Sequence, residues 1–216
     1  MTFCLLIVAK APVPGFAKTR LCPPATPEQA AEIAAASLLD TLEATLITPQ
    51  ARVVVAMTGD LGQATRSSEI TAALRKTEVI PQRGERFDMR LVNAHTDAPR
   101  PGEPVLQIGM DTPQVTPALL ADAAKPLETK DSVLGLAEDG GWWALGLQDP
   151  LHAKALAGVP MSRDDTGLLT LCALADIGLN PGILPTLSDV DTIADARRVA
   201  AATPHGRFAR AVAEVR

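Results

Sequence analysis

Short apolar runs alternate along the chain with longer segments of helical periodicity. Runs rich in Leu, Ile and Val are typical of strands buried on both faces of a parallel sheet. In the first half they occupy residues 2–8, 52–57, 78–80 and 105–109. Thr26, Pro27 and Gln29 form the start signal of a helix, and an Ala, Leu and Ile pattern continues it to Leu46. The first half therefore predicts strands alternating with helices.

The second half continues this alternation. We expect helices over residues 117–127, 168–177 and 193–202, and strands over residues 132–137, 142–147 and 182–187. Asp164 or Asp165 is expected to cap the second of these helices, and the Ala- and Arg-rich tail with His205 is expected to be a surface helix. No repeat or low-complexity linker divides the chain. The sequence predicts one domain, residues 1–216, with an α/β fold: a three-layer α/β/α sandwich around a mainly parallel, Rossmann-like sheet.

The composition narrows the classes of function. The chain has 216 residues, 47% of them hydrophobic, and a net charge of −5, which suits one α/β domain with a sizeable core. No block of Lys and Arg is present and aromatic residues are few, so a nucleic-acid partner is not expected. Three separated cysteines fit reduced thiols. The first apolar run resembles neither a signal peptide nor a membrane span, so we expect a soluble cytoplasmic protein.

Asp111 follows directly on the apolar run at residues 105–109. Gly109 allows close approach of the backbone, and Pro113 cannot donate to a ladder, so the strand has to end there. Ligands of open α/β sheets bind at the carboxyl ends of the strands. A carboxylate at that edge is suited to holding a divalent cation that bridges to phosphate oxygens. A helix cap or a turn would explain the same aspartate.

The loop after the first strand, residues 10–21, carries three cations. Lys10, Lys18 and Arg20 stand in a segment that is stiffened by two prolines and hinged at Gly15. Backbone N–H groups and cations of such a loop can share the charge of a pyrophosphate. The loop is not a Walker A motif, because Ala17 precedes Lys18. A solvated basic loop is the other interpretation of the same residues.

Four segments together resemble a known family. They read AKAPVPGFAKTRL, GMDTP, LAEDGGWWALGL and DVDTIADARRV, in this order along residues 2–199. They are similar to motifs of the DUF2064 family of GT-A-type glycosyltransferases, also described as rSAM/selenodomain-associated transferases. The segment from Gln82 to Arg90 matches the family only in part, since Asp88 and Met89 stand where the family has Gly and Glu. Trp142 stands where the family usually has Tyr.

The resemblance implies a nucleotide-diphospho-sugar transferase fold that binds Mg²⁺ or Mn²⁺. It implies metal ligands at Asp111, Asp189 and Asp191, and an acceptor pocket at Gly140, Gly141 and Trp142. Asp139 would orient or deprotonate the acceptor, and Lys18 would assist catalysis at the donor phosphates. The implied nucleotide-binding residues are Ala9, Lys10, Pro12, Gly15, Lys18, Arg20 and Gln82.

Several alternatives remain open at the level of sequence. The donor could be a nucleotide sugar or, as in enzymes that guanylylate phospholactate, a nucleoside triphosphate that releases pyrophosphate. A non-catalytic nucleotide-binding module is a third interpretation. Asp139 could be an ordinary hairpin residue, and Asp191 or Thr192 could be a helix cap. His95 is expected to be structural. The expected partners are a nucleotide-activated donor and a small-molecule acceptor, and a homodimer is one compatible assembly.

Overall fold

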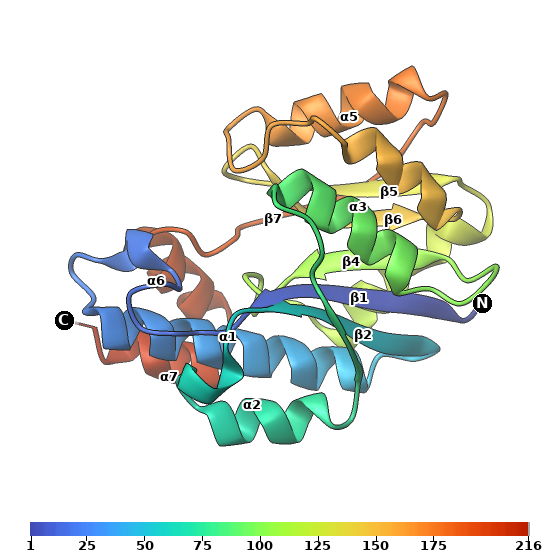
Figure 1. Cartoon of the computed structure of the whole chain (residues 1–216). Helices are drawn as coiled ribbons and strands as arrows, with labels where there is room; N and C mark the ends of the chain where they lie inside the picture. Colours follow the sequence, from blue (N-terminus) through green and yellow to red (C-terminus); the bar gives the residue numbers. More distant parts are fainter. Residues whose placement is uncertain (216) are drawn as a thin grey trace.

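A seven-stranded sheet of order β3-β2-β1-β4-β6-β5-β7 forms the middle layer of the computed structural model, which describes residues 1–215 (Figure 1). Six strands run in one direction, and β6 alone runs antiparallel, between β4 and β5. The strands are β1 (Phe3–Lys10), β2 (Ala51–Thr58), β3 (Glu78–Pro81), β4 (Val105–Gly109), β5 (Ser132–Ala137), β6 (Trp142–Leu147) and β7 (Gly182–Leu187). The mainly parallel sheet expected from the sequence is confirmed.

The central strand β1 is buried on both faces because helices cover the sheet on both sides. Its side chains alternate between two cores: Leu5 and Ile7 join one, and Leu6 and Val8 join the other. This alternation explains why its sequence is apolar at nearly every position. The three-layer α/β/α sandwich is therefore also confirmed.

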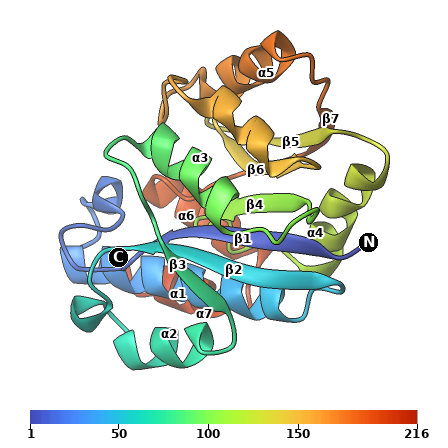
Figure 2. The same ribbon diagram turned by 45° about the vertical axis from the view of Figure 1, so that its right-hand side comes forward.

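One face of the sheet is covered by α1 (Pro27–Leu46), α2 (Ser67–Leu74) and α4 (Pro117–Ala124). The other face is covered by α3 (Phe87–Asp97), the 3₁₀ helix η4 (Pro150–Leu156) and α5 (Thr166–Asp176). Figure 2 shows α3 and α1 on opposite sides of β1 and β4. The capping box predicted for α1 is present, because Thr26 Oγ1 accepts from the Gln29 N–H and the Gln29 side chain accepts from the Thr26 N–H.

The helix expected over residues 193–202 is present as α6 (Ile193–Ala202), and the tail after it forms α7 (Arg207–Ala213), with His205 in the exposed turn between them. Both helices pack near α1 (Figure 1). Phe208 and Val212 are buried in a third apolar cluster together with Ile33 of α1. The tail is thus a helix at the surface with Arg210 exposed, and two large apolar residues on its other side attach it to the domain.

The start of α5 also differs from the prediction. The helix begins at Thr166, and Asp165 stands at its N-cap without a hydrogen bond from its side chain to the helix. The Asp165 carboxylate instead accepts from Arg163 at 2.9 Å. Neither Asp164 nor Asp165 therefore caps the helix through its side chain.

The described residues, 1–215, include no helix that is both long and apolar enough to cross a membrane. The longest helix, α1, has 20 residues and carries charged side chains among its apolar ones.

His95 is fully buried on α3, as expected for a structural residue. Burial lowers the pKa of His95 to about 4, and the neighbouring Gln107 side chain offsets only part of this shift. His95 is consequently neutral in the folded protein near pH 7, whereas the unfolded chain takes up a proton below its ordinary value of 6.5. The pKa shift therefore predicts a loss of stability as the pH falls from about 6.5 towards 4.

We predict that His95→Met removes this pH dependence. Between pH 7 and pH 5 the His95 side chain is protonated in the unfolded wild type but stays neutral in the folded protein. This difference lowers the free energy of unfolding by about 2 kcal/mol. Urea unfolding at both pH values measures the loss, and the variant should lack it. His205→Met, in an exposed position between α6 and α7, is the control and should behave like the wild type. An equal pH dependence in all three proteins would contradict the assignment.

We predict that Gly140→Ala is far more destabilising than Gly178→Ala. Both glycines have a left-handed backbone, with φ of 88° and 84°, so an alanine at either position is strained by about 1–2 kcal/mol. Only at Gly140 would the new Cβ lie 1.8 Å from the Asp164 carbonyl oxygen, while at Gly178 it would meet open space. Chemical denaturation of the two variants measures the difference. Equal losses would mean that the 137–141 turn does not pack on residue 164 in solution.

Candidate functional site

A cavity of about 760 Å³ opens at the edge of the sheet where β1 and β4 end and β6 begins. The loop after β1 and the segment between β7 and α6 form one side of it. The residues 161–166 before and at the start of α5, and the first turns of α3, form the other. Predicted site residues that line the cavity are Lys10, Lys18, Arg20, Asp111, Asp139, Gly141, Trp142, Asp189 and Asp191.

Lys18 lies between two carboxylates in this cavity. Its Nζ is 3.0 Å from Asp111 Oδ2 and 3.2 Å from Asp191 Oδ1. Arg20 Nη1 lies 2.8 Å from the other oxygen of Asp191. The Lys18 side chain is mostly buried, whereas Arg20 is 65% exposed. The loop after β1 thus pairs with the carboxylates through two cations, the buried Lys18 and the exposed Arg20.

These neighbours decide the charge state of Lys18. Burial alone would lower the pKa of Lys18, but the charges of Asp111 and Asp191 and their hydrogen bonds outweigh it, so the pKa stands above its ordinary value. Lys18 is therefore a fixed positive charge. Its backbone is in the left-handed region, with φ of 49°, at the start of the 3₁₀ turn η1 (Thr19–Leu21).

The Asp111 backbone is held in place by two neighbouring elements. Ser37 of α1 donates to the Met110 carbonyl oxygen at 2.6 Å, and the N–H of Val190 donates to the Asp111 carbonyl oxygen at 3.2 Å. The second bond places the segment after β7 directly beside the end of β4. The carboxylates of Asp111 and Asp191 are close for this reason.

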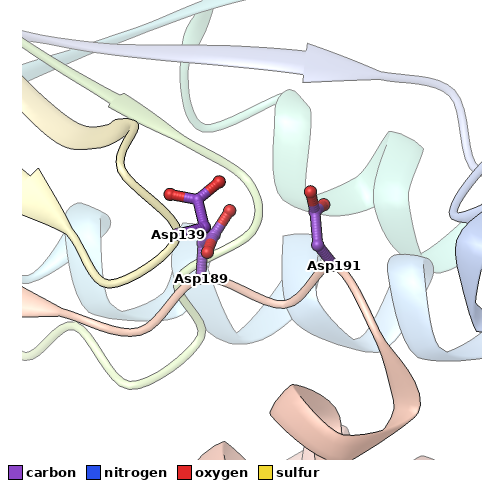
Figure 3. Close-up of side chains that lie close together, drawn as sticks. All are labelled: Asp139, Asp189 and Asp191. Atoms are coloured by element: carbon purple, nitrogen blue, oxygen red, sulfur yellow. The ribbon is translucent and has the colours of Figure 1, made fainter. Parts of the chain in front are cut away.

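Asp139, Asp189 and Asp191 form an acidic cluster, in which one oxygen of each lies within 4.8 Å of the others (Figure 3). Asp139 belongs to the turn between β5 and β6, and the other two follow β7. Thr192 and Asp195 make the capping box of α6, so Asp191 is not needed as a cap. Asp139 Oδ1 also accepts from the Gly141 N–H at 2.8 Å.

The electrostatics of this cluster favour a cation. Burial raises the pKa of Asp189 to about 6, the charges of Asp139 and Asp191 add to the shift, and Lys18 opposes it. Carboxylate oxygens are the ligands that Mg²⁺ and Mn²⁺ prefer, and a divalent cation would remove the repulsion between these groups. The donor set therefore fits such a metal, but it contains Asp139 in place of the expected Asp111, whose carboxylate pairs with Lys18 instead.

The other side of the cavity has an apolar wall next to the polar residues Ser162, Arg163 and Asp164. Phe87 and Leu91 of α3, Trp142 at the start of β6, and Met161 line it. Trp142 is half-buried, whereas Trp143 is 2% exposed and donates from Nε1 to the Pro185 carbonyl oxygen at 2.9 Å. Trp143 is the core residue of the pair, as expected, but it also lines the cavity beside Trp142.

Five of the predicted site residues do not line the cavity: Ala9, Pro12, Gly15, Gln82 and Gly140. The Gln82 side chain donates to the carbonyl oxygens of Ala9 and Ala56, each at 2.9 Å, and so joins the ends of β1 and β2. Gly140 accepts a hydrogen bond from the Gly167 N–H at 2.8 Å and lies against residue 164. In this structure these two residues support neighbouring backbone.

Other cavity residues carried no signal in the sequence. Phe87 and Met161 are single apolar residues in polar segments, and only the fold brings them to the same wall. Thr112 lines the cavity as a buried residue, and its Oγ1 has no hydrogen-bond partner among residues 1–215. A buried hydroxyl without a partner is costly.

Comparison with known families identifies the chain. Residues 41–163 match the family described as uncharacterized protein conserved in bacteria (DUF2064). The chain belongs to the DUF2064 family. This match covers more than half of the 216 residues and confirms the resemblance seen in the sequence motifs. No curated protein matches this DUF2064 member.

Solved structures show the fold of this DUF2064 protein. A candidate nucleotide-diphospho-sugar transferase from Desulfovibrio desulfuricans G20 matches with a TM-score of 0.85 and 23% identity, over 100% of this chain and 99% of that one. A CMP:2-keto-3-deoxy-manno-octonic acid synthetase complexed with CTP has a TM-score of 0.60 and 13% identity, over 94% and 99%. Rv0371c of Mycobacterium tuberculosis H37Rv, complexed with manganese, has a TM-score of 0.54 and 20% identity, over 92% and 97%.

We predict that this DUF2064 protein binds Mn²⁺ and that Asp189→Asn weakens the binding by at least about tenfold, which is ~1.4 kcal/mol. Burial and the neighbouring carboxylates raise the pKa of Asp189, so its ionised form would be stabilised by a bound cation. Titration followed by electron paramagnetic resonance of free Mn²⁺ measures the affinity. Asp176→Asn, which removes an equal charge from an exposed position in α5, should bind like the wild type. Equal weakening by both substitutions would remove Asp189 from the metal site.

Proposed function

We propose that this protein is a metal-dependent glycosyltransferase that uses a nucleotide-diphospho-sugar donor. The proposal rests on one observation: cationic and acidic side chains line the same cavity. Lys18 and Arg20 come from the loop after β1, and the carboxylates come from the ends of β4, β5 and β7. A diphosphate needs cations and a divalent metal, and this cavity offers groups for both.

In this proposal Asp189 and Asp191 hold Mg²⁺ or Mn²⁺, and Asp111 completes the ligand set. The metal supplies a positive charge that neutralises the departing diphosphate. Lys18 and Arg20 bind phosphate oxygens, and Lys10 stands at the same side of the cavity. Each cation stabilises charge that grows as the bond to the leaving group breaks.

The acceptor would lie between the 137–141 turn and the apolar wall. Asp139 is exposed there, with Gly141 and Trp142 beside it. It would take the proton of an acceptor hydroxyl whose oxygen attacks the anomeric carbon. The bond from that carbon to the phosphate oxygen breaks, and the nucleoside diphosphate leaves with the electron pair. Asp139 could instead be a third metal ligand, and the Mn²⁺ affinity of Asp139→Asn decides between the two roles.

Nucleotidyl transfer is a second candidate function. Three cations of one loop also suit a triphosphate, and the similar synthetase structure is complexed with CTP. In that reaction the acceptor oxygen attacks the α-phosphorus and pyrophosphate leaves. The product that leaves, a nucleoside diphosphate or pyrophosphate, separates the two reactions.

We also propose that the whole chain forms one such transferase domain and acts in the cytoplasm. The apolar clusters that join α1, α6 and α7 connect the carboxyl-terminal helices to the first half of the chain. The three cysteines are unpaired, which suits a reducing compartment.

We predict a metal-dependent rise in melting temperature with one family of nucleotides. Thermal unfolding is measured with nucleoside diphosphates, triphosphates and nucleotide sugars, with and without Mn²⁺. A ligand at ~100 times its dissociation constant adds about 2.7 kcal/mol, a shift of about 5–11 °C at this size, because each 1 kcal/mol shifts the melting temperature by about 2–4 °C. Asp111→Asn should abolish the rise, and Asp176→Asn should keep it.

The outcomes of this panel separate the candidates. A rise with one nucleotide sugar, followed by release of its nucleoside diphosphate, would support glycosyl transfer and identify the donor. A rise only with triphosphates, followed by pyrophosphate release, would support nucleotidyl transfer. A rise with nucleotides but no turnover would support a binding module. No rise with any nucleotide would refute all three proposals.

A further inference from the structure

We propose that Lys18 is a positioning residue that exchanges between the carboxylates of the metal site and the phosphates of the donor, so that metal and nucleotide bind cooperatively. The inference rests on the proposed function, because it assigns both ligands to this cavity. It concerns the order and coupling of binding, which neither the fold nor the family determines.

The first observation is that Lys18 stands where a metal ion would compete with it. Its Nζ bridges Asp111 and Asp191, and an oxygen of Asp191 lies within 4.8 Å of an oxygen of Asp139 and of Asp189. Both oxygens of Asp191 are engaged, one by Lys18 and one by Arg20. A divalent cation bound by Asp191 would meet a buried ammonium a few ångströms away and would be repelled by it.

The second observation is that the first loop can supply this cation to a different partner. Lys18 and Arg20 stand on either side of Thr19 in a short 3₁₀ turn, and both side chains reach into the cavity. A metal that takes over the carboxylates would leave the two cations without partners. The oxygens of an incoming diphosphate would then pair with Lys18 and Arg20 in place of the carboxylates. Bound diphosphate would thus spare the metal the free energy of leaving two cations unpaired, and bound metal would spare the diphosphate the free energy of separating these ion pairs.

This exchange requires positive coupling between Mn²⁺ and a nucleoside diphosphate. By linkage the coupling is reciprocal, and typical values are about 5–150-fold. Removing Lys18 should change the Mn²⁺ affinity in opposite directions depending on whether the residue competes with the metal or only supports the structure. A structural lysine would leave the metal site disordered when removed, and metal affinity would fall. A competing lysine leaves the carboxylates free, and metal affinity rises.

The test is Mn²⁺ binding to Lys18→Met in the absence of nucleotide. We expect this variant to bind Mn²⁺ at least about fivefold more tightly than the wild type, at the lower limit of typical coupling. Lys10→Met is the matched control. Lys10 lines the same cavity and carries the same charge, but its Nζ donates to the Phe16 carbonyl oxygen at 2.8 Å and pairs with no carboxylate of the described residues. Its removal should change Mn²⁺ affinity less than about twofold, because solvent screens an exposed charge.

A second measurement uses UDP and GDP as probes. In the wild type each nucleotide that binds should tighten Mn²⁺ binding, after correction for Mn²⁺ chelated by free nucleotide. In Lys18→Met this coupling should fall and nucleotide affinity should decrease, while metal affinity stays high. Arg20→Met should shift Mn²⁺ affinity in the same direction by a smaller factor, because its side chain is mostly exposed. It keeps the test decisive if Lys18→Met does not fold.

The results that overturn the exchange are distinct from those that overturn the proposed function. Unchanged or weaker Mn²⁺ binding in Lys18→Met, or equal tightening in Lys10→Met, would refute the exchange in a protein that still binds nucleotides. If no nucleotide changes Mn²⁺ binding, in the wild type or in Lys18→Met, the proposed function is refuted. Absence of Mn²⁺ binding in every variant would refute both.

Discussion

The ion pairs of Lys18 hold the candidate site together, because they join three distant parts of the chain at one point. The loop after β1, the end of β4 and the segment after β7 converge on this one ammonium. Their backbones are fixed separately, by Ser37 on Met110 and by Val190 on Asp111. The sheet therefore determines where the carboxylates stand, and Lys18 determines how closely they approach one another without a metal.

The cavity combines two kinds of surface that belong to opposite faces of the sheet. The charged side lies near α1 and α6, and the apolar side continues the core beneath α3 and η4. Val8 and Leu91 belong to that core and also line the cavity. A ligand that spans the opening would thus meet charge at one end and aromatic or aliphatic side chains at the other. This arrangement suits a molecule with a phosphate part and a less polar part.

Much of the fold could be predicted because its signals are local. The apolar run of β1, the capping box at Thr26 and the glycine turn before Trp142 each determine an element within a few residues. The site was predicted less completely, because its residues meet through pairings that no local pattern encodes. Asp139 was expected on the acceptor side alone, yet its carboxylate lies with Asp189 and Asp191. Phe87 and Met161 become neighbours of the cavity only when α3 and the loop before α5 pack on the same face.

The separation of Lys18 and Asp191 along the chain, 173 residues, has a consequence for how the site forms. Contacts between residues so far apart form late, because a long loop has to close before they stabilise anything. During synthesis Lys18 can pair with Asp111 as soon as β4 is in place, whereas its second carboxylate and the carboxylate that pairs with Arg20 both belong to Asp191, which is made 80 residues later. The last strand therefore completes the sheet, and the aspartate that follows it completes the ion pairs of the loop after β1.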